Sequence, residues 1–386
     1  MQRANIHKRF WVRRGESLDF SDGGFLVDPD SEWGHITNSN ALPFQRIADT
    51  PCLCLLGEPG MGKSTALESE HENLRSTLKP PDKSMFLDLR AYSTDQRLHD
   101  ALFEASTYRE WLLGSHRLQL FLDSLDECLI RIDNVAALLL EGLRQAPVER
   151  LLLRIASRTA DWQSTLEYGF RGRWGETAVE VFELAPLRRV DVVTEARSVG
   201  PEPELFLKEV EQREAVALAN RPITLKFLLR SYQRNGAFPP TRAGLYEEGC
   251  LCLCEEPNES RRDARRRGDL TAQQRLAVAS RIAAFTIFGN RYAIWTGHIG
   301  DLASEDIAVD RLTGGTEGPG ADLEVSIRAV REALDTGLFS SRGANRLGWA
   351  HQTYAEFLAA RYLASHGLSV DRMLEFVLHP GDPGRV

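Results

Sequence analysis

The stretch Gly57-Glu58-Pro59-Gly60-Met61-Gly62-Lys63-Ser64-Thr65 fits the pattern G-x-x-x-x-G-K-[ST]. A short apolar run at 52–56 precedes it, and residues 65–68 can start a helix. A phosphate-binding loop needs this strand–loop–helix setting. Its glycines let the backbone wrap closely around phosphate oxygens, so that N–H groups point inward beside the positive end of the helix. A glycine-rich turn with an incidental lysine is the alternative, and the flanking patterns favour nucleotide binding over it.

The loop supplies most of the expected contacts with a nucleotide, either ATP or ADP. We expect Lys63 to reach the β- and γ-phosphates and the Ser64 hydroxyl to coordinate Mg²⁺. The full set of expected contacts within the loop is Gly57, Gly60, Met61, Gly62, Lys63, Ser64 and Thr65.

The composition is that of an ordinary soluble globular protein. The chain has 386 residues and a net charge of −8, and it is long enough for two or three units. The acidic balance argues against a nucleic-acid-coating protein. No apolar run resembles a signal peptide or could span a bilayer, so we expect a cytoplasmic protein without a membrane partner.

The six cysteines indicate a reducing compartment, because they do not resemble a secreted disulfide framework. Cys250, Cys252 and Cys254 stand close together in the sequence. A metal site is one interpretation, but the set lacks the spacing and the second ligand pair of zinc sites. Buried cysteines on a helix face are therefore the favoured interpretation.

Between residues 50 and 187, short apolar runs alternate with helical stretches. The runs are 52–56, 85–89, 118–122, 151–156 and 179–184, with helical segments such as 100–113 and 135–144 between them. This alternation predicts a parallel sheet with helices on both faces, the α/β fold of a P-loop NTPase. Ligands then bind beyond the carboxyl ends of the strands.

The third apolar run ends in Asp123-Ser124-Leu125-Asp126-Glu127. An unpaired carboxylate at the end of a buried strand is costly, and Mg²⁺ on a nucleotide would supply a partner. Asp123 is therefore the expected Mg²⁺ carboxylate. Asp126 and Glu127 are expected to orient or activate an attacking water. A solvated acidic turn is the alternative, which the nearby phosphate loop makes less favoured.

The fourth apolar run ends in Ser157-Arg158-Thr159. An arginine at the end of a strand beside a phosphate site can sense or neutralise the charge of a γ-phosphate. Arg158 is therefore assigned to the catalytic set, with an ordinary surface arginine as the alternative.

Three segments together, residues 57–65, the D-S-L-D-E segment at 123–127 and Ala-Ser-Arg at 156–158, carry a family resemblance. The combination resembles the NACHT branch of the STAND NTPases, the signalling ATPases that include the NOD-like receptors and many bacterial relatives. Residues 220–225 resemble the family's helical-domain motif, which implies that Pro222 packs against adenine. Asn220 stands where the family often has glycine.

A last match lies at residues 349–360, W-A-H-Q-T-Y-A-E-F-L-A-A. It resembles the motif in which a winged-helix histidine contacts the nucleotide phosphate in the closed, ADP-bound state, and this implies that role for His351. Taken alone, a histidine that starts an amphipathic helix is more often structural.

The motifs divide the chain into five parts. They are a lead-in segment (1–49), a nucleotide domain (50–187), a small helical domain (188–236), a winged-helix-like domain (237–365) and a tail or the start of a further region (366–386). Helices are expected at 204–218, 222–232, 245–254 and 272–288. Residues 338–349 are expected to form a hairpin with its turn at 342–345.

The resemblance implies an ATP-driven signalling switch with slow hydrolysis. Exchange of bound ADP for ATP would let subunits assemble into a homo-oligomer, with effector and sensor modules outside this chain or on separate partners. Antiviral (anti-phage) defence is the implied role. A constitutive P-loop ATPase that remodels a partner or nucleic acid is one alternative, and a scaffold that holds nucleotide only for stability is another. The basic run 261–267 could touch nucleic acid, but a solvated loop is favoured there.

Overall fold

The computed structural model describes residues 8–58, 60–128, 130, 132–159, 162–255, 270–318, 323–342, 345–369 and 371–372. Several predicted features lie outside the described residues, namely Pro59, the basic run 261–267, the turn residues 343–344 and the tail at 373–386. The side chain of Glu127 also lies outside them. In the described ranges, no helix has both the length and the apolar character needed to cross a membrane.

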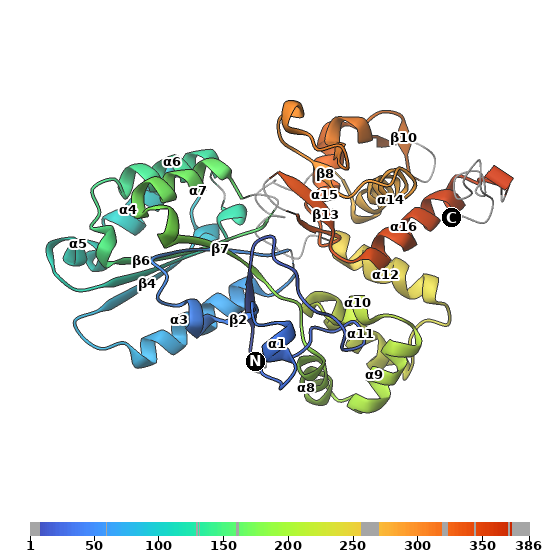
Figure 1. Ribbon diagram of the computed structural model, residues 1–386, viewed down its shortest axis with the longest axis horizontal. Coiled ribbons are helices and arrows are strands. Elements are labelled where there is room, and N and C mark those ends of the chain that lie inside the picture. Colours follow the sequence, from blue (N-terminus) through green and yellow to red (C-terminus); the bar gives the residue numbers. More distant parts are fainter. Residues whose placement is uncertain are drawn as a thin grey trace.

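A seven-stranded sheet forms the centre of the nucleotide domain, with strand order β2-β1-β7-β3-β6-β5-β4 (Figure 1). Its five parallel strands match the five predicted apolar runs and are β3 (Cys52–Leu56), β4 (Lys83–Asp88), β5 (Leu118–Asp123), β6 (Leu151–Ser157) and β7 (Val179–Leu184). Every residue of β3 is buried, as expected for a strand covered on both faces. The predicted α/β class is confirmed.

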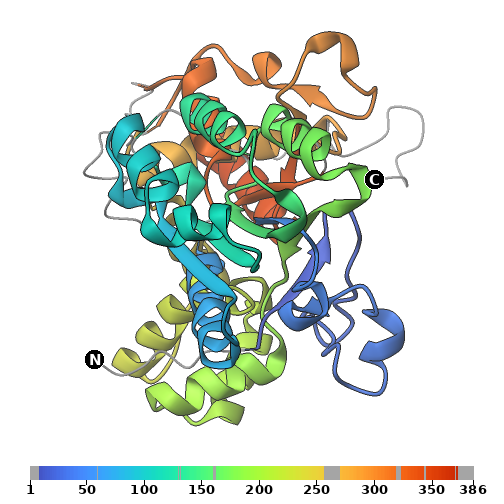
Figure 2. The ribbon, with the colours of Figure 1, turned by 90° about the vertical axis from the view of Figure 1, so that its left-hand side faces the viewer.

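The N-terminal segment adds two strands that the sequence did not predict. Strand β1 (Phe10–Arg13) pairs antiparallel with β7, and β2 (Leu42–Pro43) pairs antiparallel with β1. Figure 2 shows this segment in dark blue beside the sheet. The sheet is therefore mixed, with the five predicted strands parallel to one another and two short antiparallel strands added beside β7. Between Asp22 and Leu26 the backbone forms only isolated bridges, because Gly23 and Gly24 have positive φ angles that interrupt an extended backbone.

Helices cover both faces of the sheet. Alternate residues of β3 point to opposite faces of the sheet. Cys52 and Cys54 lie in the core formed with α4 to α7, and Leu53 and Leu55 lie in the core formed with α2 and α3. The helices of this part are α1 (Gly34–Thr37), α2 (Phe44–Ile47), α3 (Lys63–Thr77), α4 (Asp95–Phe103), α5 (Ser106–Leu113), α6 (Ile132–Gly142) and α7 (Ser164–Trp174). The predicted helix 100–113 is in fact two helices, because Ala105 has the extended ψ of 137°.

The helical unit follows β7 and consists of α8 (Arg189–Val199), α9 (Pro203–Gln212), α10 (Val216–Ala219) and α11 (Pro222–Asn235). The predicted helix 204–218 is broken between α9 and α10. Glu214 has φ +49°, a left-handed conformation that a right-handed helix cannot contain.

The C-terminal unit contains α12 (Arg242–Cys254), α14 (Ala272–Phe288), α15 (Ile327–Leu334) and α16 (Gln352–Ser365). The predicted helix at 272–288 is confirmed in its bounds. A small sheet of order β12-β13-β8-β9 joins β8 (Ile294–Trp295), β9 (Ile307–Ala308), β12 (Phe339–Ser341) and β13 (Arg346–Trp349). Strands β12 and β13 pair antiparallel, which confirms the predicted hairpin. Strands β10 (Thr316–Glu317) and β11 (Leu323–Glu324) form a separate pair.

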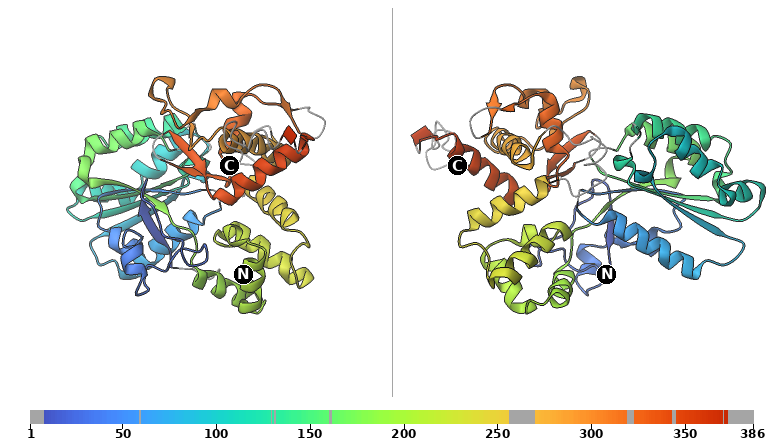
Figure 3. Two further views of the ribbon diagram at one scale, coloured as in Figure 1. Left: turned by 45° about the vertical axis from the view of Figure 1, so that its right-hand side comes forward. Right: turned by 180° about the vertical axis from the view of Figure 1, so that it is seen from behind.

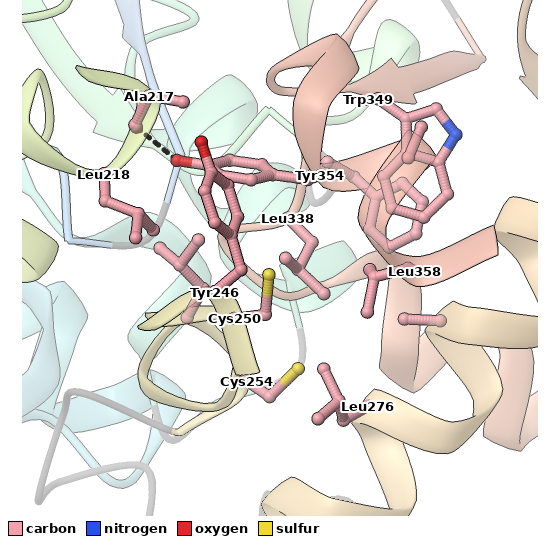
Figure 4. Close-up of a cluster of buried hydrophobic side chains, with 14 of the residues drawn as sticks. Ala217, Leu218, Tyr246, Cys250, Cys254, Leu276, Leu338, Trp349, Tyr354 and Leu358 are labelled. Carbon is pink, nitrogen blue, oxygen red and sulfur yellow. Dashed lines mark hydrogen bonds between the residues drawn. The ribbon is translucent and has the colours of Figure 1, made fainter. Parts of the chain in front are cut away.

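The helical and C-terminal units share one hydrophobic core. Tyr354 on α16 donates a hydrogen bond to the carbonyl of Ala217 on α10 (Figure 4). Cys250 and Cys254 are buried in the same core, as the interpretation of buried cysteines expected, whereas Cys252 is only partly buried. The two views in Figure 3 show both units on the same side of the nucleotide domain. Short 3-10 helices complete the chain, at η1 (Leu89–Ala91), η2 (Leu125–Glu127), η3 (Val148–Arg150), η4 (Glu176–Ala178), η5 (Ile299–Asp301) and η6 (Val309–Leu312).

Candidate nucleotide-binding site

The strand order brings the predicted site residues of the nucleotide domain together. Strand β6 lies between β3 and β5, and all three run parallel. Their carboxyl ends therefore meet at one edge of the sheet, where parallel α/β sheets bind their ligands. The phosphate loop follows β3, Asp123 ends β5, and Arg158 follows β6.

The phosphate loop has the backbone that its glycines allow. Gly60 and Gly62 have φ angles of +74° and +84°, which residues with a Cβ rarely adopt. Helix α3 begins directly afterwards, at Lys63. The Lys63 ammonium donates to the carbonyl of Gly57 and so folds back over the loop. Met61 is buried, whereas Thr65 is exposed in the first turn of α3.

The surroundings of Asp123 fit a divalent cation. Its side chain is buried, and Oδ2 accepts a hydrogen bond of 3.1 Å from the Ser124 hydroxyl. Oδ1 is also buried, and it has no hydrogen-bond donor within the described part of the chain. Burial raises the pKa of the Asp123 carboxyl. A buried carboxylate oxygen without a partner is costly, and Mg²⁺ is a partner that it suits.

Ser124 connects the two predicted Mg²⁺ ligands. Its Oγ lies 3.4 Å from the Oγ of Ser64, in addition to its bond to Asp123. Ser124 has φ +62° and ψ +48°, a left-handed conformation that is unusual for a residue with a side chain. Sequence reasoning assigned no role to this residue, although its small size was noticeable between two acidic positions.

Arg158 and Asp126 bond to each other. The backbone N–H of Arg158 donates to Asp126 Oδ1 at 2.9 Å, and its Nε lies 2.9 Å from Asp126 Oδ2. Arg158 Nη1 also lies 3.4 Å from both the carbonyl oxygen and Oδ1 of Asp335, in the turn after α15. Arg158 and Asp126 are both buried. Arg158, the predicted γ-phosphate sensor, thus contacts both the acidic loop and the C-terminal unit.

The start of α11 lies against the phosphate loop. A Cβ placed on Gly62 would be 3.8 Å from Pro222 Cγ, and one placed on Gly60 would be only 2.5 Å from Ile223 Cγ2. The carbonyl of Asn220 accepts a hydrogen bond of 2.8 Å from the backbone N–H of Leu187, which ties this segment to the end of the nucleotide domain. Pro222 is therefore placed beside the nucleotide site.

His351 caps α16, because its Nδ1 accepts a hydrogen bond of 3.2 Å from the backbone N–H of Thr353. Burial, together with the nearby charge of Arg221, lowers the pKa of His351. Over the described residues, no hydrogen bond joins His351 to the phosphate loop. Its predicted phosphate contact stays a prediction.

Two charged residues at this junction were missed by sequence reasoning. Glu58 accepts a hydrogen bond of 3.3 Å from the Thr159 hydroxyl. Burial raises the pKa of Glu58, and the charges of Arg221 and Lys63 act in the opposite direction. Arg221 is itself buried and donates to the carbonyl of Gly337 at 2.7 Å. Both residues adjoin predicted positions, but no spacing rule singles them out.

No protein-family model matches this sequence, and neither does any curated protein. Three solved structures illustrate its structural likenesses. A Walker-type ATPase of Pyrococcus abyssi is 15% identical, with 81% of this chain and 92% of that chain covered and a TM-score of 0.40. RuvB of Thermotoga maritima is 11% identical over the same shares, also with a TM-score of 0.40. Cdc6p from Pyrobaculum aerophilum is 12% identical, with 91% and 100% covered and a TM-score of 0.36.

The class of the nucleotide domain follows from its own geometry. A glycine-rich loop joins a buried strand to a helix, a buried carboxylate ends a second strand, and the strand between them ends beside an arginine. These are the fold and site of a P-loop NTPase.

Proposed function

We propose that this chain is an ATP/ADP-dependent switch of the NACHT type. Slow ATP hydrolysis would be coupled to domain rearrangement and to assembly of a homo-oligomer. Signalling in antiviral (anti-phage) defence is the role that the sequence resemblance suggests. Effector and sensor modules would lie outside this chain or on separate partners, and the partner would not be nucleic acid.

One observation supports this proposal above the others, the position of Arg158. Arg158 follows β6 at the edge of the sheet that carries the phosphate loop, yet its Nη1 lies 3.4 Å from Asp335 Oδ1 in the C-terminal unit. Arg158 is 2% exposed, so its charge is costly unless it is paired. Asp126 already pairs with Arg158 inside the nucleotide domain, so the added contact with a residue 177 positions along the chain links this arginine to the C-terminal unit.

A second arginine reaches the same turn from the helical unit. Arg221 donates to the carbonyl of Gly337, two residues after Asp335. The turn 335–337 is therefore held from two sides, by one arginine of the nucleotide domain and one of the helical unit. Loss of either contact would loosen the C-terminal unit.

The switch follows from a competition for Arg158. ATP and ADP differ by the γ-phosphate, and a ligand shifts an equilibrium only by its different affinity for the two states. In the proposed ATP state, Arg158 would exchange Asp335 for the γ-phosphate, because charged hydrogen bonds to phosphate are strong. The C-terminal unit would then lose this bond to the nucleotide domain.

Replacement of Asp335 tests this competition. We expect Asp335→Asn to release ADP about fivefold faster than the wild type, a coupling of ordinary size for linked sites. Stopped-flow displacement of a fluorescent ADP analogue measures the rate. Asp310→Asn, at an exposed position in the same unit, is the matched control and should leave the rate unchanged.

Two results would count against the switch. One is an unchanged ADP release rate in Asp335→Asn, provided that Lys63→Ala abolishes Mg²⁺-dependent binding as expected. The other is steady ATP turnover by the wild type without any change of assembly, which would favour a constitutive ATPase.

A further inference from the structure

Arg9, from the segment that precedes the nucleotide domain, contacts the phosphate loop. Its Nη1 donates to the carbonyl of Met61 at 2.7 Å, and its Nη2 donates to the carbonyl of Ala185 at 2.7 Å. Ala185 directly follows β7, where the chain leaves the sheet for the helical unit. One guanidinium therefore joins the phosphate loop to that connection.

Arg9 is a partly buried cation. Desolvation lowers the pKa of Arg9 to about 10, so the side chain is still charged at neutral pH. Within the described part of the chain, its partners are the two carbonyls and no carboxylate forms an ion pair with it. A cation held in this way by backbone carbonyls fixes their direction, because charged hydrogen bonds are stronger than neutral ones.

The bond to Met61 has a consequence for the next residue. The peptide between Met61 and Gly62 is planar and trans, so its C=O and N–H point in opposite directions. With the carbonyl held toward Arg9, the N–H of Gly62 points away from Arg9. That N–H has no acceptor among the described residues. Inward-pointing N–H groups of this kind are what a phosphate loop offers to its ligand.

We propose that Arg9 is a positioning residue of the nucleotide site, which holds the Met61–Gly62 peptide plane so that the Gly62 N–H faces a bound phosphate. The inference rests on the nucleotide site of the proposed function. Arg9 acts on the phosphate chain of any ligand and makes no use of the base. Its second bond, to Ala185, couples the shape of the loop to the connection that leads into the helical unit.

Binding of two ligands tests this role. Isothermal titration calorimetry in Mg²⁺ gives the Kd of ATP and of tripolyphosphate, which has no base or ribose. Arg9→Met should weaken both ligands by about tenfold, the effect of losing one charged hydrogen bond. Arg9→Lys keeps the charge but cannot hold two carbonyls at once, so it should weaken both ligands by a smaller factor. Arg13→Met is the matched control, because Arg13 is exposed and pairs with Glu180 on the same sheet, and it should bind as the wild type does.

The outcomes separate the inference from the proposed function. An unchanged Kd of tripolyphosphate in Arg9→Met would overturn the inference. Weaker ATP binding alone would also overturn it, because that result assigns Arg9 to the base or ribose. If the wild type binds neither ligand, the proposed function itself fails. Thermal unfolding without ligand checks the fold, and if Arg9→Met does not fold, Arg9→Lys carries the same comparison.

Discussion

The two oxygens of the Asp123 carboxylate have different surroundings. Oδ2 accepts a bond from Ser124, whereas Oδ1 is buried without a donor in the described ranges. Burial raises the pKa of this carboxyl above its ordinary value. The protonated carboxyl therefore adds to the stability of the protein at acid pH, and this stabilisation is lost as the pH rises through the raised pKa. At neutral pH, the ionised group therefore destabilises the protein until a cation binds.

Asp123→Asn should consequently stabilise the protein without ligand and abolish its response to Mg²⁺. The gain should be about 1 kcal/mol or more, the usual cost of a buried polar group without a partner. Urea unfolding with and without Mg²⁺-ATP measures both effects. Asp88→Asn is the control, because Asp88 lies opposite Asp123 in the sheet but already accepts a hydrogen bond from Arg90. Its replacement should therefore not stabilise the protein. A less stable Asp123→Asn variant that still responds to Mg²⁺ would contradict this account.

The sequence was informative for site residues that follow a strand directly. The phosphate loop and Asp123 could be located from spacing alone, because the end of a buried strand leaves few positions for a polar group. The partner of Arg158 could not be located in this way. Asp335 is 177 residues away, and only the packing of the C-terminal unit brings it near. Arg9 was missed for the same reason, since its partner Met61 is 52 residues away.

Helix α16 begins at a histidine whose neutral form the fold favours. The pKa of His351 is lowered in the folded protein. The neutral side chain therefore stabilises the fold fully above the ordinary histidine pKa of about 6.5, and this stabilisation is lost as the pH falls through the lowered pKa. Acidification should therefore weaken this end of α16, and with it the contact between α16 and α10.

Replacement by asparagine separates the role of His351 as a helix cap from its titration. His351→Asn keeps a good helix cap but removes the titration. We expect the variant to lose less stability than the wild type between pH 7 and pH 5, as measured by urea unfolding at both values. The exposed His298 offers the control variant His298→Asn, which should behave as the wild type. An equal loss of stability in His351→Asn and the wild type would show that this histidine does not carry the effect.

At the scale of elements, the apolar runs were predictable and the two short N-terminal strands were not. The runs that became β3 and β7 match their strands in both bounds. Strand β3 is apolar throughout because it is buried on both faces. Strand β1 has four residues, and its pairing with β7 determines its conformation. The breaks near Ala105 and Glu214 were missed because neither residue is a typical helix breaker.

Three units meet around the phosphate loop in the whole molecule. Ile223 of the helical unit packs on Gly60, and Arg158 and Arg221 both reach the turn 335–337. The order of the units along the chain could be predicted from the motifs. The resemblance implied that Pro222 lies at the nucleotide site, but the side-chain contacts between the units could not be predicted, because each one joins residues that are far apart in sequence and follows from packing. The edge of the nucleotide domain that carries the phosphate loop and Arg158 thus contacts both other units, as the proposed switch requires.

We propose that the nucleotide state decides the assembly of this protein. The most direct test is the mass of the protein in solution by multi-angle light scattering, in Mg²⁺, first with ADP and then after exchange for a non-hydrolysable ATP analogue. The account predicts a monomer with ADP and a larger homo-oligomer with the analogue, while Lys63→Ala stays monomeric under both conditions. An unchanged mass in wild-type protein that demonstrably binds the ATP analogue would contradict it.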